Sequence, residues 1–191
     1  MALGFYLDTN KCIGCRTCHI TCKDLRGLGL GPVFRKVRAF ETGAYPDVDG
    51  FRYCGSCNHC ENALCVTACP VNALSYAADG TVQLDADTCI ACKACITACP
   101  YGAIEFVEEW GVAGKCDSCK SLREAGSNTA CVDSCVMRCL DFGDMAALQA
   151  KYGPGLTSDL PILPASSRTR PRLLIKAKAS ALRADFREVE I

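Results

Sequence analysis

The sequence is dominated by cysteines that recur in four groups of nearly the same spacing. The first and third groups read Cys-x2-Cys-x2-Cys-x3-Cys, the second has a longer middle gap, and the fourth carries an eleven-residue insertion there. Every group ends in Cys-x3-Cys. The groups are Cys12, Cys15, Cys18 and Cys22; Cys57, Cys60, Cys65 and Cys69; Cys89, Cys92, Cys95 and Cys99; and Cys116, Cys119, Cys131 and Cys135. A repeat of this kind predicts four related metal-binding sites.

The spacing is typical of [4Fe–4S] clusters. Each cubane needs four thiolates, and the run Cys-x2-Cys-x2-Cys-x3-Cys places three on one cluster while the fourth reaches another. Zinc is the main alternative, because Cys-x2-Cys pairs are also zinc clamps. Zinc is most plausible for the fourth group, whose layout of pair plus pair resembles a structural zinc site. We expect four [4Fe–4S] clusters as cofactors.

Two cysteines fall outside this pattern. Counting back from Cys69 leaves Cys54 unused in the second group, and Cys139 aligns with Ala73 and Ala103 in the segments that follow the second and third groups. We expect neither to be a ligand, and Cys139 to be a small buried residue, as free cysteine often is. Eighteen cysteines less these two leave sixteen, or four for each of four clusters.

Composition narrows the class of protein. The hydrophobic fraction of 50% includes 18 cysteines among 191 residues, so the apolar core is small and bound metal must contribute folding free energy. The start, MALGFYLDTNKC, does not resemble a secretory signal, and no apolar run is long enough to span a membrane. We expect a soluble subunit without its own signal, cytoplasmic or exported and membrane-associated through a partner. Disulfides are therefore disfavoured, and zero formal net charge argues against nucleic-acid binding.

No other motif in the sequence predicts catalysis. There is no GxGxxG, no Walker-type GK[ST] and no nucleophile elbow, so we expect no catalytic residues on this chain. The two histidines, His19 and His59, lie within cysteine groups. We expect them to be packing or surface residues, with a hydrogen bond toward a cluster as the alternative.

The remaining pattern predicts an α+β fold. Alternation favours short strands at 4–8, 80–85 and 103–109, and a hairpin formed by 33–41 and 50–54. Each Cys-x3-Cys should begin a short helix, since that spacing keeps both residues on one face. The result is the β-α-β pattern of bacterial ferredoxins, used twice.

The chain resembles the iron–sulfur subunits of the dimethyl sulfoxide reductase family, whose catalytic subunits carry molybdenum or tungsten bis-pterin. The resemblance rests on the segments GFYLDTNKCIGCRTC, SCNHCENALC, CIACKACITACPYGAIEF and LDFGDMAALQAKYG. It covers roughly residues 4–150, and the tail beyond 155 matches only loosely. One departure is at the end of the fourth group, where Cys135 is followed by Val136; the second and third groups end in Cys–Pro.

The resemblance implies two interleaved ferredoxin-like modules of two [4Fe–4S] clusters each. One comprises residues 1–35 plus 106–150, and the other comprises residues 54–105. A β-hairpin insertion occupies 36–53, and 151–191 form an extended partner-binding tail.

The resemblance also implies that ligands are exchanged between groups. Relatives place the first-group cluster nearest the catalytic subunit, and the presence of Cys92 implies a full [4Fe–4S] cluster in place of a [3Fe–4S] centre. The implied sets are cluster A, Cys12, Cys15, Cys18 and Cys135; cluster B, Cys22, Cys116, Cys119 and Cys131; cluster C, Cys57, Cys60, Cys65 and Cys99; and cluster D, Cys69, Cys89, Cys92 and Cys95.

These patterns together predict an electron-transfer subunit that passes single electrons to or from a large molybdenum or tungsten bis-pterin catalytic subunit. A membrane anchor or a soluble electron donor would be a further partner. The alternatives are a free-standing polyferredoxin, the iron–sulfur subunit of a formate dehydrogenase or hydrogenase complex, and a zinc-bound interaction protein. The hairpin and the basic tail, with seven Lys and Arg residues in 168–187, favour a fixed partner over a diffusing carrier.

Overall fold

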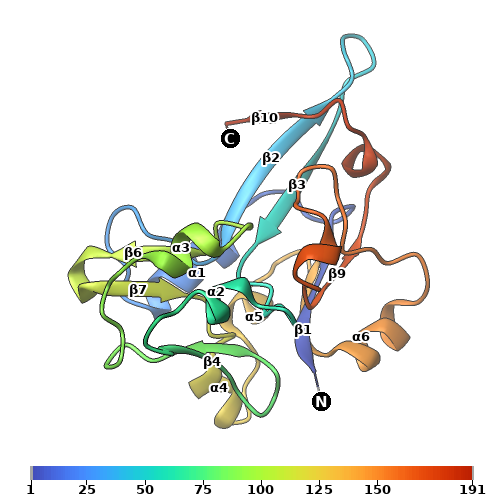
Figure 1. Ribbon diagram of the computed structural model, residues 1–191. Coiled ribbons are helices and arrows are strands. Elements are labelled where there is room, and N and C mark those ends of the chain that lie inside the picture. The colour runs from blue at the N-terminus through green and yellow to red at the C-terminus, as the bar shows by residue number, and fades with distance from the viewer. Residues whose placement is uncertain (1, 191) are drawn as a thin grey trace.

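The computed structural model describes residues 2–190 and consists of four small sheets linked by short helices and long loops (Figure 1). In one three-stranded sheet β1 (Leu3–Asp8) is central. It pairs antiparallel with β8 (Leu140–Asp144) and parallel with β9 (Leu173–Lys176). The strand expected at 4–8 is confirmed, and both of its partners come from the far end of the chain.

The predicted hairpin is also confirmed. Strand β2 (Lys36–Thr42) pairs antiparallel with β3 (Asp49–Gly55), and β10 (Arg187–Val189) adds to the other edge of β2. Figure 1 shows this hairpin extending away from the rest of the molecule, with the C-terminal strand alongside it. The hairpin therefore joins the middle of the chain to its end.

Two small hairpins complete the strands. β4 (Leu74–Tyr76) pairs with β5 (Val82–Leu84), and β6 (Ile104–Val107) pairs with β7 (Val112–Lys115). The predicted strands at 80–85 and 103–109 are present but shorter. The second ends early because the 3₁₀ helix η1 (Glu108–Trp110) and Gly111, with φ +67°, turn the chain into β7.

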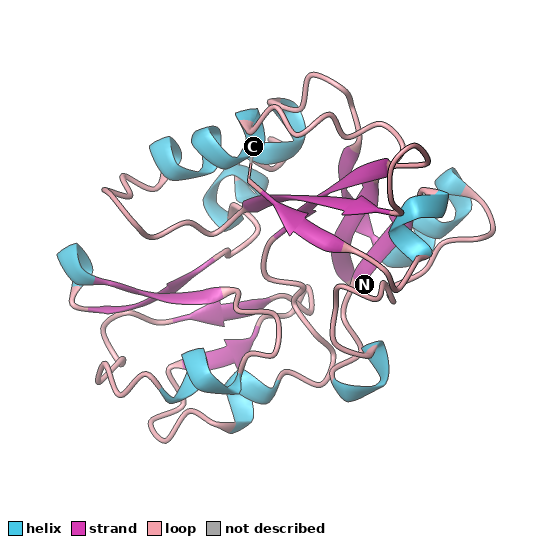
Figure 2. Ribbon diagram, turned by 90° about the horizontal axis from the view of Figure 1, so that it is seen from above, coloured by secondary structure: helices cyan, strands magenta, loops and turns pink. Residues whose placement is uncertain are grey.

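The helices are short (Figure 2), and four of them carry cysteines. The third cysteine of each group lies in a helix, which confirms the helices expected at the Cys-x3-Cys steps. The four helices are α1 (Thr17–Leu25), α2 (Leu64–Thr67), α3 (Ala94–Ala98) and α5 (Ala130–Asp133). α4 (Lys120–Glu124) lies in the insertion of the fourth group, and α6 (Met145–Tyr152) follows β8. None of the helices within residues 2–190 has both the length and the apolar character needed to cross a membrane.

The segment after α6 is largely extended, as expected, but it returns to this chain's own core. β9 lies beside β1, and Leu173 and Ile175 are buried there. The 3₁₀ helices η2 (Ser166–Arg168) and η3 (Ala179–Leu182) punctuate the segment, and Ala181 is fully buried. The tail completes two sheets because β9 pairs with the free edge of β1 and β10 pairs with the outer edge of β2.

Buried apolar side chains form two clusters. The larger one surrounds β1, the β2–β3 hairpin and β9, and the smaller one lies between the β4–β5 and β6–β7 hairpins. Cysteines contribute to both clusters. The core is therefore built around the thiols, which agrees with the low apolar content once cysteine is set aside.

Candidate cluster-binding sites

The structure gathers the sixteen cysteines of the four sequence groups at four places, which we call sites A to D. Three of these are small cavities. Their cysteines are Cys12, Cys15, Cys18 and Cys135 at site A; Cys22, Cys116, Cys119 and Cys131 at site B; and Cys57, Cys60, Cys65 and Cys99 at site C. The similar cysteine lining suits one kind of cofactor at all three.

The remaining four cysteines, Cys69, Cys89, Cys92 and Cys95, form site D beside α3. Burial raises the pKa of Cys95, and the nearby thiolates of Cys89, Cys69 and Cys92 raise it further. Cys92 is exposed to solvent. Site D is therefore the most open of the four groups, together with the edge of site A that carries the exposed Cys15.

The packing of helices in pairs explains why cysteines from different sequence groups line one cavity. α1 packs against α5, and α2 packs against α3. Because each helix carries the third cysteine of its group and leads to the fourth, a packed pair brings the fourth cysteine of one group to the first three of the other. The three cavities are accordingly lined by cysteines from more than one sequence group. We call sites A and B the outer pair and sites C and D the inner pair.

All four loops share one backbone feature that the sequence reading missed. The residue before the second cysteine has a positive φ in every group: Gly14 (+76°), His59 (+43°), Ala91 (+59°) and Ser118 (+56°). Three of these are not glycine, so the left-handed conformation carries a strain that the fold must offset. The same turn at all four sites shows that the loops wrap their cavities in the same way.

Backbone N–H groups point at several of these sulfurs. Ala73 N donates to Cys69 Sγ over 3.2 Å, and Ser118 N donates to Cys116 Sγ over 3.3 Å. Burial alone would raise the pKa of Cys69, but the N–H groups of the 71–74 turn outweigh it and lower the pKa. Such N–H···S bonds stabilise negative charge on sulfur and tune the potential of a cluster bound there.

The four sites are neighbours in the order A, B, C, D. The pKa of Cys18 at site A is raised by the hydrogen bond with Cys54, by burial and also by Cys131 of site B. Burial raises the pKa of Cys116 at site B, and Cys57 of site C adds to the effect. Sites C and D share the smaller apolar cluster. Cysteines of sites A, B and C also belong to the larger apolar cluster, so these sites adjoin one another.

A single bound metal ion would need its ligands gathered around one point, unlike a cubane cluster. No group of three or more His, Cys, Asp or Glu side chains among residues 2–190 is arranged to hold a metal ion. In a cubane each thiolate binds a separate iron at its own corner, so the four sulfurs stand apart around the cluster.

Comparisons with known proteins agree with this cysteine arrangement. The 4Fe-4S dicluster domain family matches residues 48–145, and a 4Fe-4S binding domain family matches residues 9–27. The B subunit of the anaerobic dimethyl sulfoxide reductase of Escherichia coli is 38% identical over 186 residues, which covers 93% of this chain and 90% of the relative. The B subunit of the polysulfide reductase of Wolinella succinogenes is 36% identical and covers 90% of this chain and 92% of the relative. This protein belongs to the iron–sulfur subunits of the dimethyl sulfoxide reductase family.

Membership of this family reaches further along the sequence than the motifs indicated. The YnfG subunit of a probable anaerobic dimethyl sulfoxide reductase of Escherichia coli, at 38% identity, also aligns with 93% of this chain. Such coverage extends past residue 150 into the tail, so the limit expected from the motifs was too narrow. The structure supplies the reason, because β9 of the tail is part of the β1 sheet.

Arg35 is the most informative residue that sequence reasoning missed. It is 2% exposed, lines cavity B and lies with its guanidinium carbon 4.4 Å from the centre of the Phe5 ring. One guanidinium nitrogen donates to the Cys54 carbonyl oxygen over 3.1 Å, and the other donates to Ser56 Oγ over 2.9 Å. Burial works to lower the pKa of Arg35, but neighbouring thiolates, Cys131 first, hold it well above its usual value. Thiolate charge is what balances this buried cation.

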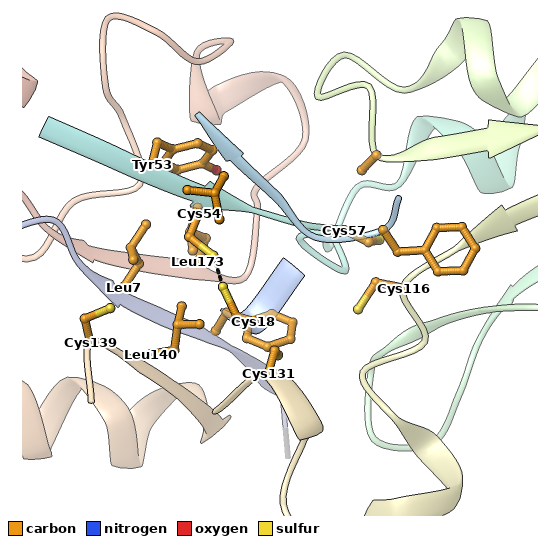
Figure 3. Close-up of a cluster of buried hydrophobic side chains, with 14 of the residues drawn as sticks. Leu7, Cys18, Tyr53, Cys54, Cys57, Cys116, Cys131, Cys139, Leu140 and Leu173 are labelled. Carbon is orange, nitrogen blue, oxygen red and sulfur yellow. Dashed lines mark hydrogen bonds between the residues drawn. The ribbon is translucent and has the colours of Figure 1, made fainter. Parts of the chain in front are cut away.

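The two cysteines outside the motif pattern both line cavity A. Cys54 Sγ lies 3.2 Å from Cys18 Sγ (Figure 3), and Cys139 Sγ lies 3.4 Å from Cys135 Sγ. Each is 3% exposed. Cys139 is buried as expected, but its contact with a sulfur of site A was not visible in the alignment of the repeats, which compares positions along the sequence and not across the fold.

The histidines behave as packing residues. His59 is completely buried, and its Nδ1 accepts the Val82 N–H over 3.0 Å. Burial holds the pKa of His59 well below its usual value, with the charge of Lys115 acting in the same direction. His19 lies on α1, and partial burial lowers its pKa too. Both shifts favour the neutral form of the ring.

Proposed function

We propose that this chain is a four-cluster relay that holds one [4Fe–4S] cluster at each of sites A to D and passes single electrons along them. The observation that carries the proposal is the partition of sixteen cysteines into four neighbouring sets of four. Each cluster, when bound, stores and releases one electron. A line of four such sites is what a relay needs, and no part of it needs a substrate.

The chain's own residues have three tasks in this proposal. The cysteines bind iron, with the cross-ligation described for sites A to D. Backbone N–H groups such as those of Ala73 and Ser118 stabilise charge on the ligating sulfurs. Burial of thiols in an apolar shell limits water access, which also sets the potential. Arg35 places a fixed positive charge beside the outer pair.

We propose that catalysis lies on a separate subunit. The named relatives are subunits of dimethyl sulfoxide reductase and polysulfide reductase. By that likeness the partner here is a molybdenum or tungsten bis-pterin subunit of the same type. A membrane anchor or a soluble donor supplies or removes electrons at the other end of the relay.

Metal analysis of the full chain, purified without oxygen, tests the cluster count. We expect about 16 iron and about 16 acid-labile sulfide per chain. A redox titration followed by EPR should show four one-electron centres and no stoichiometric [3Fe–4S] signal, because Cys92 completes site D. Zinc in place of iron, or iron well below this number in fresh protein, would contradict the proposal.

Co-purification tests the partner. A tagged chain expressed with its neighbouring genes should bring down a large subunit that contains a bis-pterin cofactor. Reduction of sulfoxides by the complex, with no oxidation of formate or hydrogen, distinguishes this assignment from a formate dehydrogenase or hydrogenase. A chain that stays monomeric and reduces several unrelated enzymes would instead be a free-standing polyferredoxin.

A further inference from the structure

We propose that Cys54 and Cys139 are reserve iron ligands of site A, able to take the iron corners held by Cys18 and Cys135. The inference rests on the proposed cluster at site A and adds two ligands to it. Cavity A is lined by six cysteines, whereas cavities B and C are each lined by four. Within residues 2–190 the surplus thiols thus lie at one site only.

The contacts place Cys54 beside Cys18, and Cys139 beside both Cys135 and Cys12. Cys54 Sγ is 3.2 Å from Cys18 Sγ, and Cys139 Sγ is 3.4 Å from Cys135 Sγ. Figure 3 shows Cys54 and Cys18 directed at one another from β3 and α1. A rotation about one side-chain bond moves a cysteine sulfur by a comparable distance, because three staggered rotamers are available to it. Backbone movement is therefore not needed for either exchange.

Both reserve thiols are attached to well-held backbone. Cys54 pairs with Val37 in the β2–β3 hairpin, and its carbonyl oxygen accepts from Arg35. The Cys139 carbonyl oxygen accepts the Asp8 N–H over 2.8 Å, just after the end of the β1–β8 ladder. These anchors keep the sulfurs against site A when the cluster is bound, so their proximity does not depend on a mobile loop.

The exchange balances without an oxidant or a reductant. The bond between iron and Cys18 sulfur breaks, and a bond between the same iron and Cys54 sulfur forms. The proton on the Cys54 thiol passes to Cys18 across their 3.2 Å contact, so the charge on the cluster is unchanged. Arg35, whose guanidinium lies 3.6 Å from Cys54 Sγ, stabilises that sulfur as a thiolate.

Alanine variants of the full chain, assembled and purified without oxygen, test the exchange. Cys18→Ala and Cys54→Ala should each keep about 16 iron and the EPR signal of site A. The double variant should lose that signal and up to about four iron. The Cys135 and Cys139 pair gives a second, independent set with the same pattern: two tolerated single changes and one damaging double change.

Cys15→Ala is the matched control. Cys15 belongs to the same site but is exposed, and its sulfur contacts Thr17 Oγ1 over 3.4 Å instead of a further cysteine. This variant should lose iron from site A as a single change. Alanine is used because a serine oxygen could itself bind iron.

The outcomes separate the two proposals. If Cys18→Ala and Cys135→Ala lose as much iron as their double variants, or fail to assemble clusters at all, the reserve-ligand inference is wrong while the relay stands. If the unmodified chain holds no iron, the relay itself is wrong. Retention of site A in both single variants together with loss in both doubles supports the inference.

Discussion

The outer and inner pairs of sites use the same cysteine repeat but differ in how much of the chain builds them. All cysteines of the inner pair lie between Cys57 and Cys99, and two short hairpins enclose them. The cysteines of the outer pair lie before and after that range, at 12–22 and 116–135. The β1 sheet that supports the outer pair is completed by β9 of the tail. The inner pair is therefore built from one short stretch of the chain, whereas the outer pair needs nearly the whole chain.

The surroundings differ as well. The outer pair has a buried arginine and two additional thiols. Around the inner pair the described residues supply a buried lysine, Lys115, near Cys65, but no additional thiol. A buried cation without a carboxylate partner is costly unless other negative charge balances it. The comparison indicates that spacing fixes where clusters bind, while long-range packing sets how each pair is stabilised and tuned.

Removal of one cross-ligand should give the largest effect. Cys22 lies in the first sequence group, but the structure places it at site B with cysteines 116 to 131. Cys22→Ala should therefore damage site B, with loss of up to about four of about 16 iron, and leave sites C and D intact. Cys69→Ala should do the reverse, damaging site D alone.

Iron analysis and EPR of both variants test this prediction. Cys54→Ala is the control and should keep its iron. Loss of the site A signal with retention of site B in Cys22→Ala would show that each sequence group binds its own cluster, and would contradict the cross-ligation.

The second-largest effect should come from a substitution that weakens the packing of the tail against the β1 sheet, which supports the outer pair. Ile175 is fully buried where β9 pairs with β1, opposite Leu7. Ile175→Ala removes buried methyl groups and leaves a cavity, so it should lower the local stability of the β1 sheet by about 2–4 kcal/mol. Hydrogen exchange of the β1 amides measures this, with β4 and β5 as an internal reference that should not change.

Val189→Ala is the matched control for the tail. Val189 is only partly buried on β10, which pairs with the outer edge of β2, so the change should cost less than about 1 kcal/mol. Equal effects of the two variants on β1 would mean that the tail does not support the outer pair through β9.

Sequence reasoning succeeded where the signal is local. The cysteine spacing predicted the four groups, and alternation predicted β1 and the β2–β3 hairpin. It could not place the tail, because β9 pairs in parallel with a strand more than 160 residues earlier, and an apolar stretch as short as Leu173 to Ile175 does not specify its partner. The contacts of Cys54 and Cys139 with site A depend on the same long-range packing.

The burial of Arg35 also could not be predicted from the local sequence. In the stretch VFRKVR, Arg35 and Arg38 look alike, since both are basic residues in a predicted strand region. The structure buries Arg35 among thiols, whereas the Arg38 side chain is 41% exposed and pairs with Glu188. Burial of a cation is favoured only when negative charge from the clusters lies nearby. The residues around position 35 do not supply that charge, so the local sequence could not predict the burial of Arg35.

Neutralising Arg35 should shift potentials at the outer pair only. A positive charge that lines the cavity of a cluster stabilises an added electron, so its removal disfavours reduction. Arg35→Met should therefore lower the reduction potentials of sites A and B, by roughly 40 mV for each ~1 kcal/mol of lost stabilisation, while the iron content stays unchanged. A redox titration followed by EPR measures this.

Arg38→Met is the matched control for charge, because it removes an exposed cation from the same hairpin and should leave the potentials where they are. Shifts of the same size at sites C and D would contradict a local role for Arg35. The contrast between the pairs would then have to come from their ligands alone.

The smallest effect should come from the ion pair that links the two pairs of sites. Asp79, in the turn between β4 and β5, accepts from Arg123 on α4 over 2.9 Å and from Thr81 N over 2.8 Å. Burial works to raise the pKa of Asp79, but Thr81 and Arg123 outweigh it and hold the pKa below its usual value. The stabilisation is thus present above about pH 3.9, the unfolded value, and is lost as the pH falls further.

Asp79→Asn keeps an acceptor for Thr81 and removes only the charge that faces Arg123. Because both side chains are partly exposed, at 26% and 15%, we expect α4 to lose less than about 1 kcal/mol of local stability at pH 7. Salt at about 1 M should shrink the difference between variant and parent, since screening weakens a pair at the surface. Hydrogen exchange of the α4 amides measures the loss of stability and its salt dependence. Asp85→Asn is the control, because Asp85 is fully exposed and has no cation partner among the described residues. This variant should not change hydrogen exchange in α4. A loss that salt leaves unchanged would mean that packing, and not charge, connects the inner pair to the outer one at this point.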